Sequence, residues 1–400
     1  MTQTVYERIG VSTIINAKGP STRVSGSILA GEVATAMSEA SQHCVDMAVL
    51  QGRASEIIAE ITGAESGLVT SGAAAGLLLG TAACVTGLDP GKMNRLPNTD
   101  GMKSEVVVAR SHRNFYDHAV RAVGVKLVEV GISDRFSGAG VRDTEAWEID
   151  DAISGNTAAV LYVAQPHALP ELSSVIEVSH RRKVPVIVDA AAQLPPVSNL
   201  QYFTGVGADL VVFSGGKALM GPQASGMLCG RRDLIAAAAL QNLDLDVRFD
   251  HWDPPGSLID KSKLVGLPQH GIGRSCKVGK EEIVGFLTAL KNFSGGGFEQ
   301  HQEKCRVVAE SLYDGLLQFE HINVELLSDC SGPGIPGVSL SQGLVKAEEL
   351  VKRLQNGTPS VYVDPSLVHE GKVRFDTLCL HSKDVPSIVH CIRTALDLCD

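Results

Sequence analysis

The sequence predicts an α/β protein built on a mostly parallel, doubly wound sheet, with a smaller α+β domain at its C-terminal end. From Gly67 to Cys229, valine-rich apolar runs alternate with amphipathic segments, which is typical of a parallel sheet with helices on both faces. The runs are short and bounded by turn residues, as expected of strands buried on both faces. The chain has 400 residues, more than the roughly 250–300 that one hydrophobic core supports, so we expect a second domain.

Composition and charge argue against several classes of protein. The net charge of −10 disfavours nucleic acid as a partner, because a phosphate backbone requires clustered Lys and Arg. The nine cysteines are scattered, with no Cys-x-x-Cys pair and no Cys/His spacing, so we expect reduced thiols and no metal site. The chain shows neither an apolar signal segment nor a run of about 18 apolar residues. We therefore expect a cytoplasmic protein with no membrane partner.

The N-terminal part of the chain predicts an arm followed by the start of the sheet domain. Residues 1–50 contain short elements: a strand near Ile15, a loop rich in Gly, Ser and Pro, and a helix that begins near Leu29. A helix at 53–62 follows, because its isoleucines recur at helical spacing and Gly63 can form its C-cap.

The middle of the chain alternates predicted strands with predicted helices. Strands are expected at 105–110, 126–131, 157–166, 185–189 and 209–214, and helices after 113, within 134–154 and at 171–184. In the polar stretch 134–154, Trp147 and Ile149 are the main apolar anchors. The last helix carries three basic residues near its C-terminus, where the helix dipole favours cations.

We expect a large domain at 51–275 and a small C-terminal domain at 276–400. The small domain is predicted to be α+β, with a helix through Arg306 to Leu317, strands at 324–327, 338–341, 361–364 and 372–377, and a closing helix after Pro386. A charged, loop-like run precedes it. Asp253, Asp260 and His270 in this run match no metal-ligand spacing, so no metal is predicted there.

An acid and a lysine at the ends of two apolar runs indicate the chemistry. Asp189 ends the run PVIVD, and Lys217 follows the run DLVVFS and two glycines. Open α/β sheets bind ligands at the carboxyl ends of their strands, so both side chains are expected to face one crevice. Pyridoxal 5'-phosphate (PLP) requires a lysine that forms a Schiff base with its aldehyde and a carboxylate that keeps its pyridine nitrogen protonated. The pair therefore predicts a PLP site.

A third motif predicts where the phosphate of PLP binds. Ser71, Gly72 and Ala73 lie where a short strand is followed by a helix of small residues. Free backbone N–H groups at a helix start bind anions, and small side chains let a phosphate approach. Ser214 adds a hydroxyl that can donate to the same phosphate. Tight packing of small residues on a sheet is the alternative interpretation of this stretch.

Together these motifs resemble fold-type I PLP-dependent enzymes, and within them the selenocysteine-synthase-like group. The resemblance covers most of the chain and rests on the segments IINAKGPSTRVSGS, SGAAAG, RSHRNFYDHA, VIVDAAAQ, FSGGKALMGPQASG and GRSCKVGKEEIVG. It implies the fold-type I transferase fold, PLP as cofactor, and a homodimer or higher homo-oligomer whose subunits share active sites. Members that act on tRNA carry an extra N-terminal region, whereas this chain starts near the shared core, so no tRNA partner is expected.

The same resemblance implies roles for residues around the ring of PLP. His112, just past a predicted strand, is expected to stack on the ring, and Ala191 to pack against the other ring face. Gln193 can reach the ring oxygen or the substrate, although this amide comes one residue later than in the commoner spacing. His112 is also interpretable as a capping or surface residue, and His167 as a loop histidine.

Substrate contacts are implied farther from the ring. The resemblance places Arg23 and Ser27 of the N-terminal arm beside the substrate and assigns the substrate carboxylate to Arg374. Arg274, with the two lysines of GRSCKVGK, is expected to hold a cofactor or substrate phosphate. Each assignment has an alternative. The arm with Arg23 and Ser27 is also interpretable as a surface loop, Arg374 as a strand arginine that faces solvent, and the GRSCKVGK segment as a solvated basic turn.

The expected reaction starts with removal of the Cα proton of an amino acid. Lys217 is placed to take this proton and Asp189 keeps the pyridinium charged, so that with His112 they form the predicted catalytic set. Resemblance to the ammonia-lyases of the group favours β-elimination from a small hydroxylated amino acid, phosphorylated ones included, to a 2-oxo acid and ammonia. Racemisation or epimerisation and aldol cleavage are open alternatives, as is a PLP-binding protein without turnover.

Overall fold

The structure is a computed structural model that describes residues 3–132, 143–166 and 168–397. Within these residues no helix is long and apolar enough to cross a membrane. The chain divides into two compact units: Leu29–Lys291 forms the larger unit, and Met1–Ile28 together with Asn292–Asp400 forms the smaller one. The sequence instead placed its domain boundaries near residues 50 and 275.

Packing explains where the two boundaries fall. The first residues join the smaller unit because strand β1 (Ile15–Ala17) pairs in parallel with β11 (Val361–Val363). Helix α11 (Lys280–Asn292) belongs with the larger unit because its buried Phe286 lies against the turn that carries Lys217. A Cβ atom added at Gly215 of that turn would come within 2.8 Å of Phe286.

A seven-stranded sheet forms the centre of the larger unit, in the order β2-β8-β7-β6-β5-β3-β4. The strands are β2 (Ser66–Thr70), β3 (Glu105–Ala109), β4 (Lys126–Val130), β5 (Thr157–Val163), β6 (Val186–Asp189), β7 (Leu210–Ser214) and β8 (Gly226–Gly230). All neighbours from β7 to β4 run parallel, and β8 is antiparallel to both β7 and β2. The predicted mostly parallel α/β sheet is therefore confirmed.

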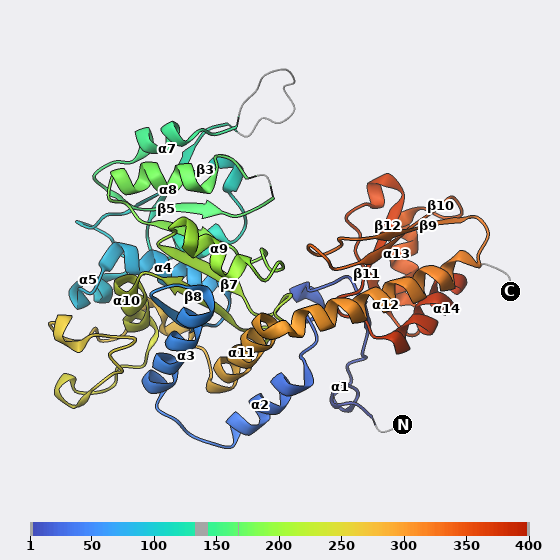
Figure 1. Ribbon diagram of the computed structural model, residues 1–400, viewed down its shortest axis with the longest axis horizontal. Helices are drawn as coiled ribbons and strands as arrows, with labels where there is room; N and C mark the ends of the chain where they lie inside the picture. Colours follow the sequence, from blue (N-terminus) through green and yellow to red (C-terminus); the bar gives the residue numbers. More distant parts are fainter. Residues whose placement is uncertain (1–2, 133–142, 167, 398–400) are drawn as a thin grey trace. The chain divides into compact units, whose positions relative to one another are not determined.

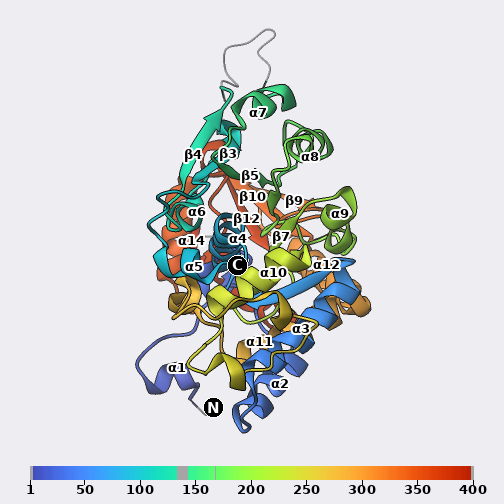
Figure 2. The same cartoon turned by 90° about the vertical axis from the view of Figure 1, so that its left-hand side faces the viewer.

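Helices cover both faces of this sheet. Besides α11, the helices of the larger unit are α2 (Gly31–Ser41), α3 (Met47–Thr62), α4 (Ala73–Thr86), α5 (Pro90–Arg95), α6 (Asp117–Arg121), α7 (Ala146–Ala152), α8 (Leu172–Arg181), α9 (Asn199–Val206) and α10 (Arg232–Asn242). Figure 1 shows the larger unit with its sheet and helices, and Figure 2 shows α8 and α9 on one side of the strands and α5 and α6 on the other.

Side chains of β7 alternate between the two faces. Leu210 and Val212 belong to the buried core that includes α4 and α10. Helix α4 approaches closely there, since a Cβ atom at Gly76 would lie 2.9 Å from Val212. On the opposite face the rings of Phe213 and Phe203, the latter on α9, are 6.1 Å apart between centroids. Burial on both faces explains why the run is apolar at every position rather than at every second one.

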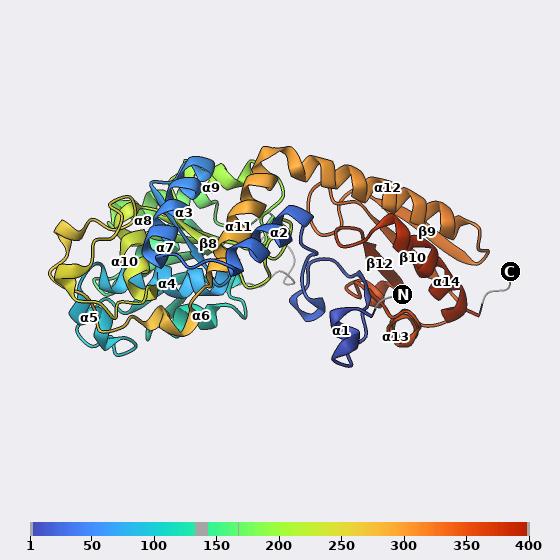
Figure 3. The same ribbon diagram turned by 90° about the horizontal axis from the view of Figure 1, so that it is seen from below.

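The smaller unit is an α+β arrangement, as predicted. Its antiparallel sheet has the order β12-β10-β9, formed by β9 (Ile322–Leu327), β10 (Gly337–Gln342) and β12 (Lys372–Asp376). Its helices are α1 (Val5–Arg8), α12 (Phe298–Leu317), α13 (Ala347–Asn356) and α14 (Val385–Ala395). The last three share one buried core with β10 and β12, and Figure 3 shows α12 running along the strands.

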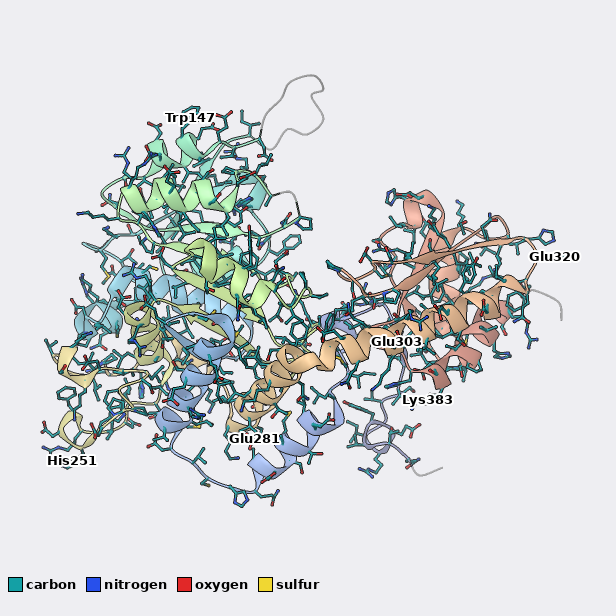
Figure 4. The ribbon with its side chains drawn as sticks, in the orientation of Figure 1. Trp147, His251, Glu281, Glu303, Glu320 and Lys383 are labelled. Carbon is teal, nitrogen blue, oxygen red and sulfur yellow. The ribbon has the colours of Figure 1, made fainter. Side chains whose placement is uncertain are left out.

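One predicted anchor is wrong. Trp147 on α7 is 56% exposed, and its indole N–H donates to Oε2 of Glu145 at 2.6 Å. Figure 4 labels this side chain at the surface of α7. Ile149 is buried as expected. Residues two positions apart on a helix point in nearly opposite directions, so α7 can bury only one of the two.

Candidate active site

Lys217 and Asp189 lie at the carboxyl ends of neighbouring parallel strands. Asp189 is the last residue of β6, and Lys217 lies in the turn after β7. Asp189 is 7% exposed, and its Oδ1 accepts a hydrogen bond from the N–H of Ala191 at 3.1 Å. Among the described residues its carboxylate forms no ion pair within 4 Å. A buried carboxylate of this kind suits a cationic ligand atom, because an opposite charge offsets the cost of burial.

Burial shifts the pKa of each residue in the direction that favours its uncharged form. It lowers the pKa of Lys217 below the ordinary value, and the nearby Asp189 partly opposes this shift. It raises the pKa of Asp189, against the effect of the Ala191 N–H group and of Lys217. An amine with a lowered pKa can attack a carbonyl or accept a proton closer to neutral pH. A protonated pyridine nitrogen would hold the Asp189 carboxyl in its charged form.

Helix α4 begins where the phosphate was predicted. Gly72 is its N-cap residue with φ of 122°, and no side chain caps its first turn. Gly226 of β8 lies so close that a Cβ atom there would be 2.8 Å from the carbonyl carbon of Gly72 and 2.9 Å from the nitrogen of Ala73. Ser214 opposes Gly226 in the β7–β8 pairing. An uncapped helix start with no large side chain beside it fits a phosphate group.

The hydroxyl of Ser71 already has an acceptor in the protein. It donates to the carbonyl oxygen of Cys276 at 2.9 Å, so a donor bond to phosphate requires this hydroxyl to rotate. The amide of Asn242 donates to the carbonyl oxygen of Gly273 at 3.0 Å. These bonds fix the 3-10 turn Ile272–Cys276, which overlaps the GRSCKVGK segment, beside residues 71–73. We call residues 71–73 the phosphate loop.

Gly215 and Gly216 are required by the packing of the lysine turn itself. A Cβ atom at Gly215 would lie 2.2 Å from Oγ of Ser225, and one at Gly216 would lie 2.4 Å from Oε1 of Gln223. The N–H of Gly215 donates to the carbonyl oxygen of Ser225 at 2.9 Å. The turn therefore folds back on the following residues, and this contact holds the backbone that carries Lys217.

His112 is buried at the end of a 3-10 turn that follows β3. Its Nδ1 accepts the N–H of Val163 at 3.4 Å, which places the proton of the neutral ring on Nε2. Its ring also packs edge-on against Tyr162, with centroids 4.7 Å apart. Val163 pairs with Asp189 across β5 and β6. His112 therefore lies at the predicted edge of the sheet, and its stacking on a cofactor ring stays a prediction.

The loop after β6 carries the other two predicted ring contacts. Ala191 is half-buried two residues past the acid. The Nε2 of Gln193 donates to the carbonyl oxygen of Ala164 at 2.8 Å, and its own carbonyl oxygen accepts from Nδ2 of Asn199 at 2.6 Å. Gln193 thus ties this loop to the end of β5, in addition to any contact with a ligand.

A pocket of about 470 Å³ lies against the phosphate loop. Its polar lining includes Ser71, Gln51, Asn242, Arg274, Lys277 and Lys280, together with the acids Asp244 and Glu282. Arg274 donates to the carbonyl oxygen of Asn242 at 3.0 Å and to Asp244 at 2.8 Å, and Lys280 pairs with Glu281. Lys277 is exposed and forms no ion pair with any described residue. Arg274 and Lys277 therefore lie together beside the loop.

The remaining predicted substrate contacts belong to the smaller unit. Nε of Arg374 donates to Asp364 at 2.9 Å, so a substrate carboxylate has to share this guanidinium. The guanidinium of Arg23 lies 5.7 Å from the ring centroid of Tyr362, a cation–π contact. Ser27 is half-buried.

Sequence reasoning missed two buried polar residues of α3, Gln51 and Ser55. Each is 1% exposed, and both bond to the backbone of β2, the strand that leads to the phosphate loop. The available signal was polar residues four apart, in line with Ile58, on the buried stripe of an apolar helix.

Comparison with known proteins identifies the family. The profile of the class-V aminotransferases matches residues 118–357, more than half of the chain. The chain belongs to the class-V aminotransferase family. Its members depend on PLP, so the cofactor predicted from Lys217 and Asp189 and the fold-type I architecture are both confirmed. The buried acid and the uncapped start of α4 fit the pyridine and phosphate ends of this cofactor.

Relatives of this class-V enzyme are similar over all or part of its length. D-glucosaminate-6-phosphate ammonia lyase of Salmonella typhimurium is 28% identical across 98% of both chains. A solved structure of an enzyme of that name has a TM-score of 0.81 at 27% identity, over 99% of both chains. A 5'-C-glycyluridine monooxygenase-decarboxylase of Streptomyces is 30% identical over 98% of this chain and 92% of its own.

The predicted selenocysteine-synthase-like group is also confirmed. An L-seryl-tRNA(Sec) selenium transferase of Actinobacillus pleuropneumoniae is 31% identical over 49% of this chain and 42% of its own length.

Among the described residues no cluster of His, Cys, Asp and Glu side chains could hold a metal ion. His167, the loop histidine, lies outside the described residues.

Proposed function

We propose that this class-V enzyme is a lyase that releases a 2-oxo acid and ammonia from a small β-hydroxy amino acid bearing a phosphate group. The observation that carries the proposal is the basic pocket beside the phosphate loop, which contains Arg274 and Lys277. Lys277 forms no ion pair with any described residue and is free to bind an anionic group in addition to the PLP phosphate, while Arg274 would share its guanidinium between this group and Asp244. The ammonia lyase similar along the whole chain is named for a sugar phosphate that bears an amino group.

Lys217 carries the proton transfers in this proposal. When bound, PLP supplies an electron sink for the negative charge that develops at Cα of the substrate. The amine of Lys217, with its pKa lowered by burial, accepts the Cα proton and returns a proton to the departing β-hydroxyl group, which leaves as water. A solvent proton then adds at Cβ and water adds at Cα, which releases ammonia and leaves the 2-oxo acid, so that substrate and products balance without an oxidant. Asp189 holds the proton on the pyridine nitrogen throughout.

The other assigned residues bind and orient the substrate. We assign the substrate phosphate to Arg274 and Lys277, and the substrate carboxylate to Arg374 with Arg23, since guanidinium groups match such anions geometrically. Ser27 and Gln193 are assigned to the substrate's hydroxyl groups. His112 and Ala191 enclose the cofactor ring.

We also infer a cytoplasmic homodimer or higher homo-oligomer. Light scattering on the PLP-loaded protein tests the oligomeric state, and a stable monomer with full activity would contradict it.

The reaction is tested with PLP-loaded protein in heavy water. D- and L-β-hydroxy amino acids, each with and without a terminal phosphate, are followed by proton NMR and an ammonia assay. We expect a 2-oxo acid and ammonia in equal amounts from a phosphorylated substrate. Deuterium at Cα without net loss of substrate would instead indicate racemisation, and an aldehyde with glycine would indicate aldol cleavage.

Two variants separate the chemistry from phosphate recognition. Lys217→Ala removes the base and should abolish turnover, whereas exposed Lys263→Ala on the same unit should not. Lys277→Ala should raise KM for the phosphorylated substrate about tenfold, with little change for its unphosphorylated analogue. Equal effects on both substrates would contradict the assignment of the pocket to a phosphate.

A second candidate reaction is suggested by the Streptomyces relative, a monooxygenase-decarboxylase that is 30% identical along almost the whole chain. A nucleoside with a glycyl side chain then replaces the sugar phosphate as substrate. Oxygen uptake and carbon dioxide release with such a compound, and no ammonia from β-hydroxy amino acids, would favour this reaction over elimination.

A further inference from the structure

One edge of the central sheet, formed by β2, lies next to the phosphate loop. Strand β2 is the last strand of the sheet and, in the part of the chain that the structure describes, pairs with β8 alone. Alternate N–H and C=O groups of an edge strand point away from the sheet and lack a strand partner. In β2 these groups include the N–H and C=O of Val69, two residues before Ser71, where the phosphate loop begins.

The side chain of Gln51 satisfies both groups of Val69. Its Nε2 donates to the carbonyl oxygen of Val69 at 2.8 Å, and its Oε1 accepts the N–H of Val69 at 3.1 Å. One turn later on α3, Oγ of Ser55 accepts the N–H of Gly67 at 3.1 Å. Gln51 and Ser55 therefore take the place of a neighbouring strand along this edge.

Helix and strand geometry explain why two side chains four residues apart reach two groups two residues apart. Four helical residues rise about 6.0 Å and two strand residues about 6.6 Å, so the two spacings nearly coincide. The helix lies close to the strand because Gly67 has no side chain: a Cβ atom there would be 2.4 Å from Ile58 of α3. Asp46 fixes the start of α3 by accepting the N–H groups of Ala48 and Val49.

We propose that Gln51 is a positioning residue for PLP: by holding Val69 it fixes the start of α4 against the cofactor phosphate. Gln51 borders the pocket beside the phosphate loop, but both ends of its amide are bonded to Val69, so by this proposal its side chain contacts neither the reacting atoms nor the cofactor. Ser55 bonds the same strand farther from the loop and holds only the strand. The proposal concerns cofactor binding, so it does not depend on which reaction the enzyme catalyses.

Gln51→Leu tests the proposal, because leucine keeps a similar shape and removes both hydrogen bonds. The PLP dissociation constant is measured by absorbance titration of the apo-protein, and stability by urea unfolding of the same preparation. We expect the dissociation constant to rise about tenfold, equivalent to ~1.4 kcal/mol. The matched control Ser55→Ala should lower the urea midpoint while changing the dissociation constant by less than about twofold.

Two results would overturn the proposal: unchanged PLP affinity in Gln51→Leu, or equal losses of affinity in both variants in proportion to their losses of stability. Gln51→Glu supplies a test if the leucine variant does not fold. A buried carboxyl has a raised pKa and, when protonated, can both donate to and accept from Val69. As the pH is lowered from about 8 to about 6, the ratio of its PLP dissociation constant to that of the wild type should therefore decrease. A ratio independent of pH would contradict the role of the donor.

Discussion

Gly226→Ala is the substitution that most directly probes the phosphate loop. The added Cβ atom would lie 2.7 Å from the carbonyl oxygen of Phe213, 2.8 Å from the carbonyl carbon of Gly72 and 2.9 Å from the nitrogen of Ala73. All three are backbone atoms, so no side chain can rotate away. Ordinary contacts begin near 3.4 Å, and 3.4 − 2.8 leaves 0.6 Å by which β8 and the start of α4 must separate.

The separation has a cost for stability and for cofactor binding. Overpacking of this kind costs about 1–3 kcal/mol. Replacing glycine by alanine in a strand stabilises the fold by roughly 0.5–1 kcal/mol, because the unfolded chain then has less conformational entropy to lose. We therefore expect the free energy of unfolding to fall by at most ~2.5 kcal/mol, with a central value of ~1 kcal/mol. The N–H groups at the start of α4 move with Ala73, so PLP affinity should fall about tenfold, given that displacements near 1 Å in a site cost up to about 100-fold.

Urea unfolding of the apo-protein and PLP titration by absorbance measure the two effects. Gly80→Ala is the matched control on α4, because its Cβ atom would meet only leucine side-chain ends at 3.2 Å and 3.4 Å, which can adjust. That control should keep both wild-type stability and PLP affinity. If Gly226→Ala binds PLP within about twofold of the wild type, the close backbone approach does not position the phosphate loop.

Three further predictions concern single side chains. Asp189→Asn removes the charge that raises the pKa of Lys217, so acetylation of this lysine in the apo-protein should reach its plateau at a lower pH; an upward shift would contradict the coupling. Gln193→Leu removes the hydrogen bond to the carbonyl oxygen of Ala164 and should lower the free energy of unfolding in urea by ~1–2 kcal/mol. An unchanged free energy of unfolding would show that this bond does not stabilise the fold. Burial raises the pKa of Cys229 to about 12, so mass spectrometry after alkylation of the native protein should find label at exposed Cys44 and not at Cys229.

The fold class and the pair Lys217 and Asp189 were predictable from the sequence because both depend on local pattern. Apolar runs of strand length, bounded by turns, identify parallel strands buried on both faces. The direction of a parallel strand then fixes which of its ends can carry a ligand. The acid and the lysine follow two such runs directly, so no long-range contact had to be known to place them at one edge.

Where local pattern was ambiguous, the interpretation failed or stayed incomplete. Trp147 and Ile149 were both apolar candidates for burial, but a short helix on a sheet buries one stripe and exposes the other. Gly215 and Gly216 precede Lys217 in the sequence, but only the structure shows that the turn folding back on Ser225 leaves no room for a side chain at Gly215.

Only the tertiary structure decided how distant segments join. The first 28 residues belong with the smaller unit because β1 pairs with β11, a partner more than 300 residues away in the sequence. The spacing of Gln51 on its helix indicates burial but not its partner Val69, and Ser71 is bonded to Cys276 across 205 positions. Backbone groups must find partners somewhere when buried, but a sequence does not state which side chain supplies them. The sequence by itself determined the kind of sheet and the chemistry at its edge, and the folded chain decided which residues hold that edge in place.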